Sequence, residues 1–171
     1  NVMIYLKGAF LTVIGICILI SCSTESTPTG ESASTEEPTP IEFDLHDNGV
    51  TILCNDSNPG DIGVVNGVEY ESVNDAVLLN RLNNGADLSK VCTSKVTGMG
   101  NLFYKRNFNQ DIGNWDVSNV IYMEGLFETS NFNQDISNWC VSQISSEPEE
   151  FSTNSPLTEE NKPKWGTCPS N

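Results

Sequence analysis

The spacing of hydrophobic and polar residues predicts several different kinds of segment along this chain. Near its start, an apolar run from Ala9 to Ile20 follows Lys7 and ends at Ser21-Cys22. A positive start, about a dozen apolar residues and a small residue at the exit are typical of a secretory signal peptide. A membrane-spanning helix needs about 20 apolar residues, but polar residues follow Cys22 at once. Residues 1–21 are therefore predicted to be a signal peptide.

The end of this apolar run, Leu19-Ile20-Ser21-Cys22, resembles the lipobox of bacterial lipoproteins. The resemblance implies that Cys22 is acylated, becomes the first residue of the mature protein and anchors it in a membrane. The alternative is a plain signal peptide with an incidental cysteine. The chain opens with Asn1 rather than Met, so its start is expected to be misassigned or truncated, and Met3 would still begin a working signal.

Residues 22–40 follow the signal peptide and contain mainly Ser, Thr, Glu and Pro after the cysteine. Residues 23–40 hold no aromatic and no branched aliphatic side chain that could be buried. Such a composition favours an extended, disordered chain. We therefore expect a tether that holds a folded domain away from the membrane.

The folded part is expected to begin near Ile41, and residues 41–86 are predicted to form a cap that contains a β-hairpin and a helix. Residues 62–65 and 68–70 are rich in apolar residues and flank Asn66-Gly67. An Asn-Gly pair supplies the positive φ angles of a type I′ hairpin turn. Residues 50–54 also have the composition of a strand.

A helix is predicted directly after this hairpin, over residues 73–83. Ser72 is the expected N-cap, and Asp75 at the third helical position completes a pair that is similar to a capping box. Gly85 is expected to end the helix.

A repeat of 24 residues is the strongest internal pattern. The segment 108–115, Phe-Asn-Gln-Asp-Ile-Gly-Asn-Trp, returns at 132–139 with a single change. Five further positions recur with the same shift, namely Val96/Val120, Met99/Met123, Leu102/Leu126, Phe103/Phe127 and Asn107/Asn131. The array covers residues 87–151 and holds about 2.5 units. This period predicts a solenoid, because each unit exposes an apolar edge that only its neighbours can cover.

Within one unit, the apolar positions are expected to point inward: Ile112, Trp115, Val117, Val120, Met123, Leu126, Phe127 and Phe132. A short strand is predicted at 115–120 and a helical turn at 123–127, which gives a coil similar to a leucine-rich repeat. The predicted fold class is thus α+β. It is a short leucine-rich-repeat-like solenoid of about 2.5 coils, capped by residues 41–86 and by a disulfide-linked C-terminal tail, residues 152–171.

Polar side chains also recur within the unit and are expected at the corners of the coils: Asn109, Asn133, Asn114, Asn138, Asp111 and Asp135. Side chains of this kind satisfy backbone groups by stacked hydrogen bonds. A calcium-binding ladder of Asp111 and Asp135 is the alternative for the two aspartates. The recurring Trp115 and Trp139 are expected in the core, because they align with Val91 in the preceding unit; an exposed stripe that stacks on sugars is the alternative.

The six cysteines have different predicted roles. Cys17 lies in the signal peptide and Cys22 carries lipid. The cysteines that remain are Cys54, Cys92, Cys140 and Cys168. Four cysteines allow three pairings, and an oxidising compartment would let them form disulfides.

The repeat favours one of these pairings. Cys92 and Cys140 occupy the repeat position of Asp116, one unit to either side of it. Neighbouring strands lie about 4.8 Å apart, so these two cysteines should be separated by roughly 10 Å, beyond the reach of a disulfide. We therefore predict Cys54–Cys92 and Cys140–Cys168, while the crossed pairing, Cys54–Cys140 with Cys92–Cys168, would have to span the array.

The charge and the candidate chemistry argue against several classes of protein. The chain has 8 Lys and Arg against 23 Asp and Glu, a net charge of −15, which would repel the phosphates of nucleic acid. His46 is the single histidine, and no nucleophile–base pair, paired-carboxylate setting or CxxC zinc motif stands out. The sequence therefore predicts no enzyme activity, no metal and no cofactor.

Three segments of this sequence resemble one family of proteins: FNQDIGNWDVSNVIYMEGLF, FNQDISNWC and PLTEENKPKWGTCP. They are similar to the BspA-like bacterial surface lipoproteins, whose leucine-rich-repeat-like units form a 26-residue surface-protein class. The resemblance covers about Asp87 to Pro169. It implies a secreted or cell-surface protein of a family in which some members are linked to adhesion and to the binding of host proteins.

These observations predict a non-enzymatic lipoprotein of the bacterial cell envelope, anchored by lipid at the outer membrane or cell surface. Its repeats would bind a protein or a glycan of a host or neighbouring cell. The candidate ligand-binding residues flank the predicted strand: Asp116, Ser118, Asn119 and Gln143. The alternative is a structural or accessory subunit of a larger envelope complex that has no ligand of its own.

Overall fold

The computed structural model of the chain describes residues 41–169. The predicted signal peptide, the predicted lipidation site Cys22 and the predicted tether up to residue 40 lie outside the described residues. Among the helices of residues 41–169, none has the length and apolar character needed to cross a membrane.

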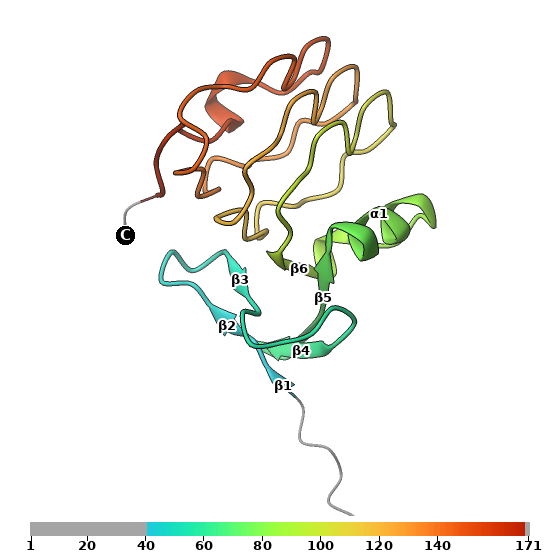
Figure 1. Cartoon of the computed structure of the whole chain (residues 1–171), viewed down its shortest axis with the longest axis vertical. Helices are drawn as coiled ribbons and strands as arrows, with labels where there is room; N and C mark the ends of the chain where they lie inside the picture. Colours follow the sequence, from blue (N-terminus) through green and yellow to red (C-terminus); the bar gives the residue numbers. More distant parts are fainter. Residues whose placement is uncertain (1–40, 170–171) are drawn as a thin grey trace, which may run out of the picture. The chain divides into compact units, whose positions relative to one another are not determined.

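Two small sheets form the N-terminal part of the described chain (Figure 1). The larger sheet has the strand order β1-β4-β5-β6. Its strands are β1 (Ile41–Glu42), β4 (Ile62–Val65), β5 (Val68–Asn74) and β6 (Val91–Lys95). β4 and β5 are antiparallel, whereas β1 runs parallel to β4 and β6 runs parallel to β5. The smaller sheet pairs β2 (Asp44–Leu45) with β3 (Ile52–Leu53) in antiparallel orientation.

The hairpin between β4 and β5 is the one that the sequence predicts. Asn66 and Gly67 have φ angles of 51° and 78°, as a type I′ turn requires of both central residues. The strand predicted at residues 50–54 is shorter, because the Asn48 side chain accepts hydrogen bonds from the N–H groups of Val50 and Thr51. That turn leaves only Ile52–Leu53 to pair with β2.

The helix α1 spans Asp75–Asn83, and its cap differs from the prediction. Asn74 is the N-cap, with its side chain accepting a hydrogen bond of 3.0 Å from the N–H of Val77. Ser72 was the predicted cap, and this prediction is wrong because β5 continues through Ser72, which pairs with Cys92 of β6. The helix ends at Asn83 with Asn84 as its C-cap, and Gly85 follows with a φ of 70°.

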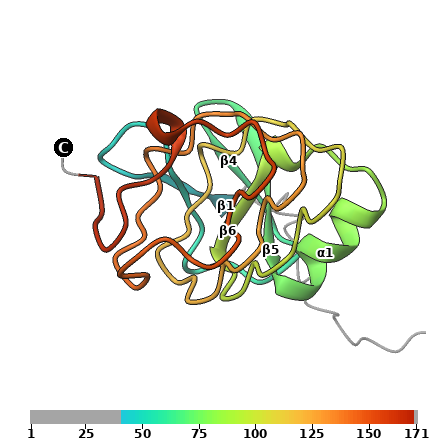
Figure 2. The same ribbon diagram turned by 90° about the horizontal axis from the view of Figure 1, so that it is seen from above.

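Backbone hydrogen bonds join residues that lie one repeat apart in the sequence. The N–H groups of Met99, Asn101 and Phe103 donate to the carbonyls of Tyr122, Glu124 and Leu126, respectively. In the next repeat, the N–H groups of Gly125, Phe127 and Thr129 donate to Glu149, Phe151 and Thr153. Successive repeats therefore lie side by side as coils, which Figures 1 and 2 show in yellow to red.

The chain within each repeat is built from tight turns. No strand forms at the predicted position, 115–120, because the N–H groups of Trp115 and Val120 close local turns with Ile112 and Val117. In place of the helical turn predicted at 123–127, a succession of turns has positive φ at Gly125 and Thr129. Because of these turns, every second N–H group points toward the next repeat and not along its own repeat.

The interior of the stack consists of the residues that the repeat pattern predicts. The eight inward positions of the central repeat are all buried: Ile112, Trp115, Val117, Val120, Met123, Leu126, Phe127 and Phe132. Equivalent aromatic rings stack on one another, with Phe103 and Phe127 centroids 5.4 Å apart and Trp115 and Trp139 centroids 6.3 Å apart. Buried aromatic side chains dominate the energetics of such a core.

Both tryptophans also tie one repeat to the one before it. The indole N–H of Trp115 donates to the carbonyl of Leu88 at 3.0 Å, and that of Trp139 donates to the carbonyl of Ile112 at 3.1 Å. Because both rings are buried, the alternative of an exposed sugar-stacking stripe is wrong.

Two disulfides are present, Cys54–Cys92 and Cys140–Cys168. They are the two pairs that the positions of Cys92 and Cys140 in the repeat predict. The first joins the end of β3 to β6, and the second joins the last repeat to the C-terminal tail.

Candidate functional site: a polar groove across the repeats

Asp116 was a candidate for binding a ligand, but the structure places it inside the protein. It is 4% exposed. One carboxylate oxygen accepts hydrogen bonds from the N–H and the hydroxyl of Ser118, and the other accepts one from the hydroxyl of Ser94 at 2.7 Å. A buried carboxylate with these partners braces two repeats, so the prediction that Asp116 contacts a ligand is wrong.

The other three predicted residues also take part in this bracing. Asn119 and Gln143 occupy the same position in successive repeats, and each donates its amide N–H to a backbone carbonyl of the preceding repeat. The acceptors are the carbonyls of Ser94, at 2.9 Å, and of Ser118, at 2.6 Å. Asn119 and Gln143 remain exposed and Ser118 is half-buried, and each uses one side-chain donor in a bond within the stack.

A more promising site lies at the corners of the coils. A groove of about 490 Å³ opens there between the repeats and the turn before β3. We call it the polar groove, and its lining residues are Val50, Tyr70, Ser89, Asp111, Gly113, Asn114, Gln134, Asp135 and Asn138. Most of them are polar and come from equivalent positions in successive repeats, so the repeat itself brings them together.

The two aspartates of the groove form the corner hydrogen bonds that the sequence predicts. One carboxylate oxygen of Asp111 accepts from the N–H of Gly113 at 3.0 Å, and one of Asp135 accepts from the N–H of Ser137 at 2.9 Å. The second carboxylate oxygen of each makes no hydrogen bond to another described residue. Within residues 41–169, no group of three or more His, Cys, Asp or Glu side chains is placed to hold a metal ion.

Equivalent amide side chains at the corners of the two repeats differ in their hydrogen bonds. Gln110 donates to the carbonyl of Ala86 and accepts from the N–H of Leu88, and Asn114 donates to the carbonyl of Ser89. Their equivalents Gln134 and Asn138 line the groove, but their side chains make no hydrogen bond to any other residue of the described chain. The second repeat therefore offers two free amide groups where the first uses them internally.

Tyr70 supplies the aromatic side chain of the groove. It is half-buried and packs against the small core of Phe43, Ile52, Val65 and the Cys54–Cys92 disulfide. Because its strand is fixed by β4 and β6, its ring is held in place at the edge of the groove.

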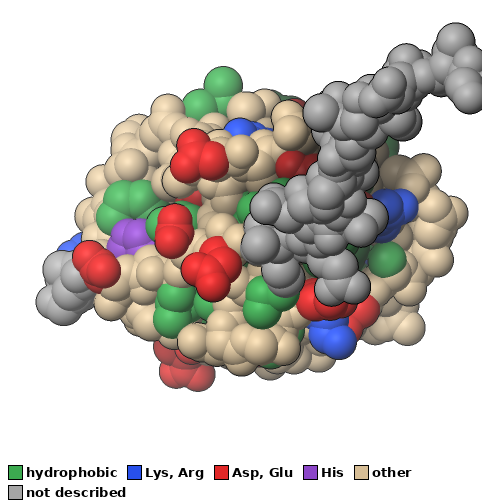
Figure 3. Space-filling view, turned by 90° about the horizontal axis from the view of Figure 1, so that it is seen from below, with side chains coloured by type: hydrophobic (Ala, Val, Ile, Leu, Met, Phe, Trp, Pro, Cys, Tyr) green, Lys and Arg blue, Asp and Glu red, His purple; other side chains and the backbone are tan. Residues whose placement is uncertain are grey.

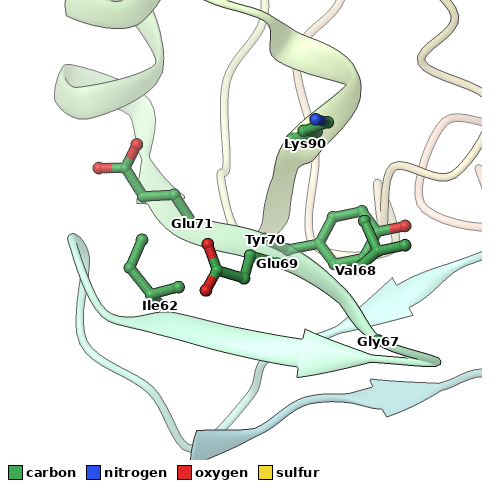
Figure 4. Close-up of a pocket in the computed structure, with 7 residues that line it drawn as sticks. All are labelled: Ile62, Gly67, Val68, Glu69, Tyr70, Glu71 and Lys90. Carbon is green, nitrogen blue, oxygen red and sulfur yellow. The ribbon is translucent and has the colours of Figure 1, made fainter. Parts of the chain in front are cut away.

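Tyr70 also lines a second hollow, of about 540 Å³, beside the β4–β5 hairpin. In Figure 4, Glu69 and Glu71 lie on the side of Ile62, whereas Tyr70 extends toward Val68. Arg81 holds the carboxylate of Glu71 with two hydrogen bonds, of 2.6 and 2.7 Å. Glu71, one of the three charged side chains of this hollow, is thus already paired, and the polar groove remains the better candidate site.

The charge of the polar groove restricts its ligands. Its acidic side chains are Asp111 and Asp135, and no Lys or Arg lines it. On the face seen in Figure 3, acidic side chains are scattered rather than gathered. A ligand for the groove should therefore donate hydrogen bonds and carry no negative charge.

The sequence did not distinguish the free amides of Gln134 and Asn138 from the engaged ones. Both pairs belong to the same motif, Phe-Asn-Gln-Asp-Ile-x-Asn-Trp. Tyr70 was assigned to the hairpin, and no sequence pattern placed it near the repeats. The interpretation of Asn114 as a corner residue is confirmed by its bond to Ser89.

Residues 72–169 match the model of a family described as Mycoplasma protein of unknown function, DUF285. The match begins within β5 and includes the repeats and the tail, which is more than half of the chain. No curated protein and no solved structure is significantly similar to the chain.

Proposed function

This chain belongs to the family described as Mycoplasma protein of unknown function, DUF285, and on that premise we propose that it is a BspA-like, non-enzymatic lipoprotein of the bacterial cell surface that binds a glycan in its polar groove. The observation that carries this proposal is the pair of free amides, Gln134 and Asn138, beside the free carboxylate oxygen of Asp135. A protein ligand is the second possibility that the experiment below distinguishes.

The chemistry of the groove suits a carbohydrate. Each amide offers two donors and an acceptor, and each carboxylate offers acceptors, so together they can satisfy both sides of a sugar hydroxyl. Ligand sites commonly combine a few placed polar groups with an aromatic wall, and Tyr70 provides a ring against which the apolar face of a sugar can stack. The groove lacks cationic side chains, so a neutral glycan fits it best.

The proposed architecture is a short leucine-rich-repeat-like solenoid in an α+β fold. Support comes from the hydrogen bonds between residues one repeat apart and from the stacked aromatic rings. Residues 41–86 would cap one end, and the tail held by Cys140–Cys168 would cap the other. Caps are needed because an array of so few repeats is not expected to be stable alone.

Binding is tested by passing a panel of soluble neutral oligosaccharides, and separately an extract of host-cell proteins, over the immobilised full chain. The double variant Gln134→Ala/Asn138→Ala should lose retention while its thermal midpoint stays unchanged, because these side chains support no internal hydrogen bond. The matched control is Asn114→Ala, which removes an internal bond at the equivalent position and should lower the midpoint. Full retention by the double variant, or retention of proteins but of no glycan, would contradict the proposal.

The location is also part of the proposal. Acylation at Cys22 and the tether would anchor the domain in the cell envelope, at the outer membrane or cell surface, where host or neighbouring-cell glycans and proteins are accessible. Proteolysis of intact cells should release peptides of residues 41–169 if the domain faces outward. Protection until the envelope is broken would place it inside.

A second candidate function is that of an envelope accessory subunit without its own ligand. The extensive internal use of polar side chains favours it, since Asp116, Asn119 and Gln143 all brace the repeats. In that case, capture of envelope proteins by the chain should be the same for the wild type and for Gln134→Ala/Asn138→Ala.

A further inference from the structure

Ile121 is unusually exposed for an apolar residue in a repeat protein. Its side chain is 67% exposed, the largest fraction among the big hydrophobic residues of the described chain. The equivalent positions in the neighbouring repeats hold the polar residues Thr97 and Ser145. The backbone of Ile121 is fixed, because its N–H donates to the carbonyl of Thr97 at 3.0 Å. Packing of the stack therefore does not explain an isoleucine at this position.

Ile121 lies at the wall of a hollow of about 420 Å³ between the last two repeats. We call this the acidic hollow, and it is distinct from the polar groove because the two share no residue. Its apolar lining comes from Ile121, Met123, Ile144 and Pro148, and its acidic lining comes from Glu124, Glu147 and Glu149. Apolar and acidic side chains thus line the same hollow, together with the polar residues Gln143, Ser145 and Ser146.

The carboxylates of the hollow are incompletely paired. One carboxylate oxygen of Glu124, Oε2, is shielded from solvent and has no hydrogen-bond partner among the described residues. Glu147 is paired with Lys162 at 2.7 Å, but Lys162 also binds Glu159 at 2.6 Å. No Lys or Arg lines the hollow itself. Glu124 and Glu149 form no ion pair among residues 41–169, so a cationic group from outside would supply a counter-charge for them.

We propose that the acidic hollow docks a basic segment of another protein, in which an apolar side chain is flanked by lysine or arginine. The apolar side chain would cover Ile121 and Ile144, and the neighbouring cation would donate to Glu124. Opposite charge would steer the encounter toward this acidic chain, while the apolar contact would retain the segment. This partner is additional to the ligand of the polar groove.

The test measures binding of a fluorescent peptide of alternating lysine and leucine to the full chain by anisotropy. The key variant is Ile121→Thr, which introduces the residue of the preceding repeat and should fold normally. Because threonine would lose most of the apolar contact, we expect affinity to fall at least about tenfold. Glu124→Gln should also weaken binding and reduce its dependence on salt.

Matched controls separate this site from general attraction to an acidic protein. Leu79→Thr removes another exposed hydrophobic side chain, on α1, and should leave binding unchanged. A peptide of alternating lysine and serine should bind at least about tenfold more weakly than the lysine–leucine peptide, because it lacks the apolar contact.

Several results would overturn the proposal. They are unchanged affinity in Ile121→Thr, equal affinity of the two peptides, and no binding of the lysine–leucine peptide at all. Sedimentation that shows a dimer of this chain which Ile121→Thr dissociates would also overturn it, since a second copy would then be the occupant.

Discussion

Single side chains hold neighbouring repeats together at defined points, and Trp139 is the best example. Its buried indole packs on Trp115 and donates to the carbonyl of Ile112. Trp139→Phe keeps an aromatic ring but removes this bond and part of the packing. We expect a loss of about 1–3 kcal/mol in the free energy of unfolding, measured by circular dichroism in urea.

Trp165→Phe is the control for that measurement, because Trp165 is half-buried and contacts Phe151 edge-on. It should cost less than Trp139→Phe. Equal losses would mean that the bond to Ile112 contributes little to stability.

Glu128 is expected to make the folding stability of the protein depend on pH. Partial desolvation, together with the charge and hydrogen bond of the neighbouring Glu150, raises the pKa of the Glu128 carboxyl. A carboxyl whose pKa is raised by folding contributes stability below its unfolded pKa and loses that contribution as the pH rises through the folded pKa. Glu128→Gln should therefore raise the thermal midpoint at neutral pH and should have little effect at acidic pH.

The matched control is Glu149→Gln, which removes one negative charge from a neighbouring exposed glutamate and should change the midpoint less. A carbon-detected NMR titration of the Glu128 carboxyl would check the direction of the pKa directly. A midpoint that Glu128→Gln lowers at neutral pH would contradict this account.

Single residues of the stack and of the polar groove could be predicted from the sequence only in part. The repeat pattern identified the inward residues, because burial follows from periodicity. It could not identify Gln134 and Asn138 as free, because whether an amide finds a partner depends on distances of a few tenths of an ångström between coils. It also selected Asp116 from inward–outward alternation, although Ser94 and Ser118 enclose that carboxylate.

At the scale of elements, the start of α1 provides a prediction with a built-in control. Asn74→Ala removes the cap of Val77 and should cost about 1 kcal/mol. Ser72→Ala should be neutral or stabilising, because the buried hydroxyl of Ser72 has no hydrogen-bond partner among the described residues. Thermal unfolding of both variants measures the difference, and the opposite order would restore Ser72 as the cap.

The elements were predictable where the local signal was strong. Asn66-Gly67 specifies a two-residue turn, so the hairpin was predicted correctly. The start of α1 was misplaced because Ser72-Val73 can equally well continue a strand, and its pairing with β6 decides the outcome. The parallel pairing of β1 with β4 has no local signal, since two-residue strands carry too little pattern.

The strand predicted at 115–120 failed for a different reason. Alternation of Trp115 and Val117 with polar residues fits a strand, but turns at each end use the N–H groups that a strand would offer to a neighbour. Tight turns and short strands place side chains inward at similar intervals, so apolar spacing alone does not separate them.

The two disulfides should differ in their response to reductant. Cys54 and Cys92 are buried, whereas Cys168 is exposed and Cys140 half-buried. The rate of thiol–disulfide exchange depends on how easily the reductant reaches the sulfur atoms. Mild reductant should therefore open Cys140–Cys168 first. Alkylation followed by mass spectrometry would measure the order, and earlier labelling of Cys54 or Cys92 would contradict it.

Loss of the exposed disulfide should loosen the tail. The double variant Cys140→Ser/Cys168→Ser should lose up to about 3–4 kcal/mol on the loop-entropy account. Hydrogen exchange should accelerate most at the amides of Ile136 and Val141, which donate to carbonyls of Asn161 and Thr167 in the tail. Uniform acceleration over all repeats would show instead that the stack unfolds as one unit.

At the scale of the whole molecule, the net charge of −15 opposes folding through self-repulsion. Salt screens charges over about 10 Å at 0.1 M. We expect the thermal midpoint to rise as sodium chloride is increased from low concentration to about 0.1 M. A midpoint that falls with salt would show that attractive ion pairs such as Glu71–Arg81 outweigh the repulsion.

The placement of the two disulfides has a consequence for how genes of this kind can change length. Both cysteines of the Cys54–Cys92 disulfide precede the junction of Phe132 and Asn133 in the sequence, and both cysteines of Cys140–Cys168 follow it. A coding unit of one repeat could be inserted at this junction without falling between the two cysteines of either disulfide. The inserted unit would join its neighbours by the same Phe-Asn sequence, which occurs at Phe108-Asn109 and at Phe132-Asn133. Recombination between the copies would lengthen or shorten the array while both ends, and the bonds that secure them, are inherited intact.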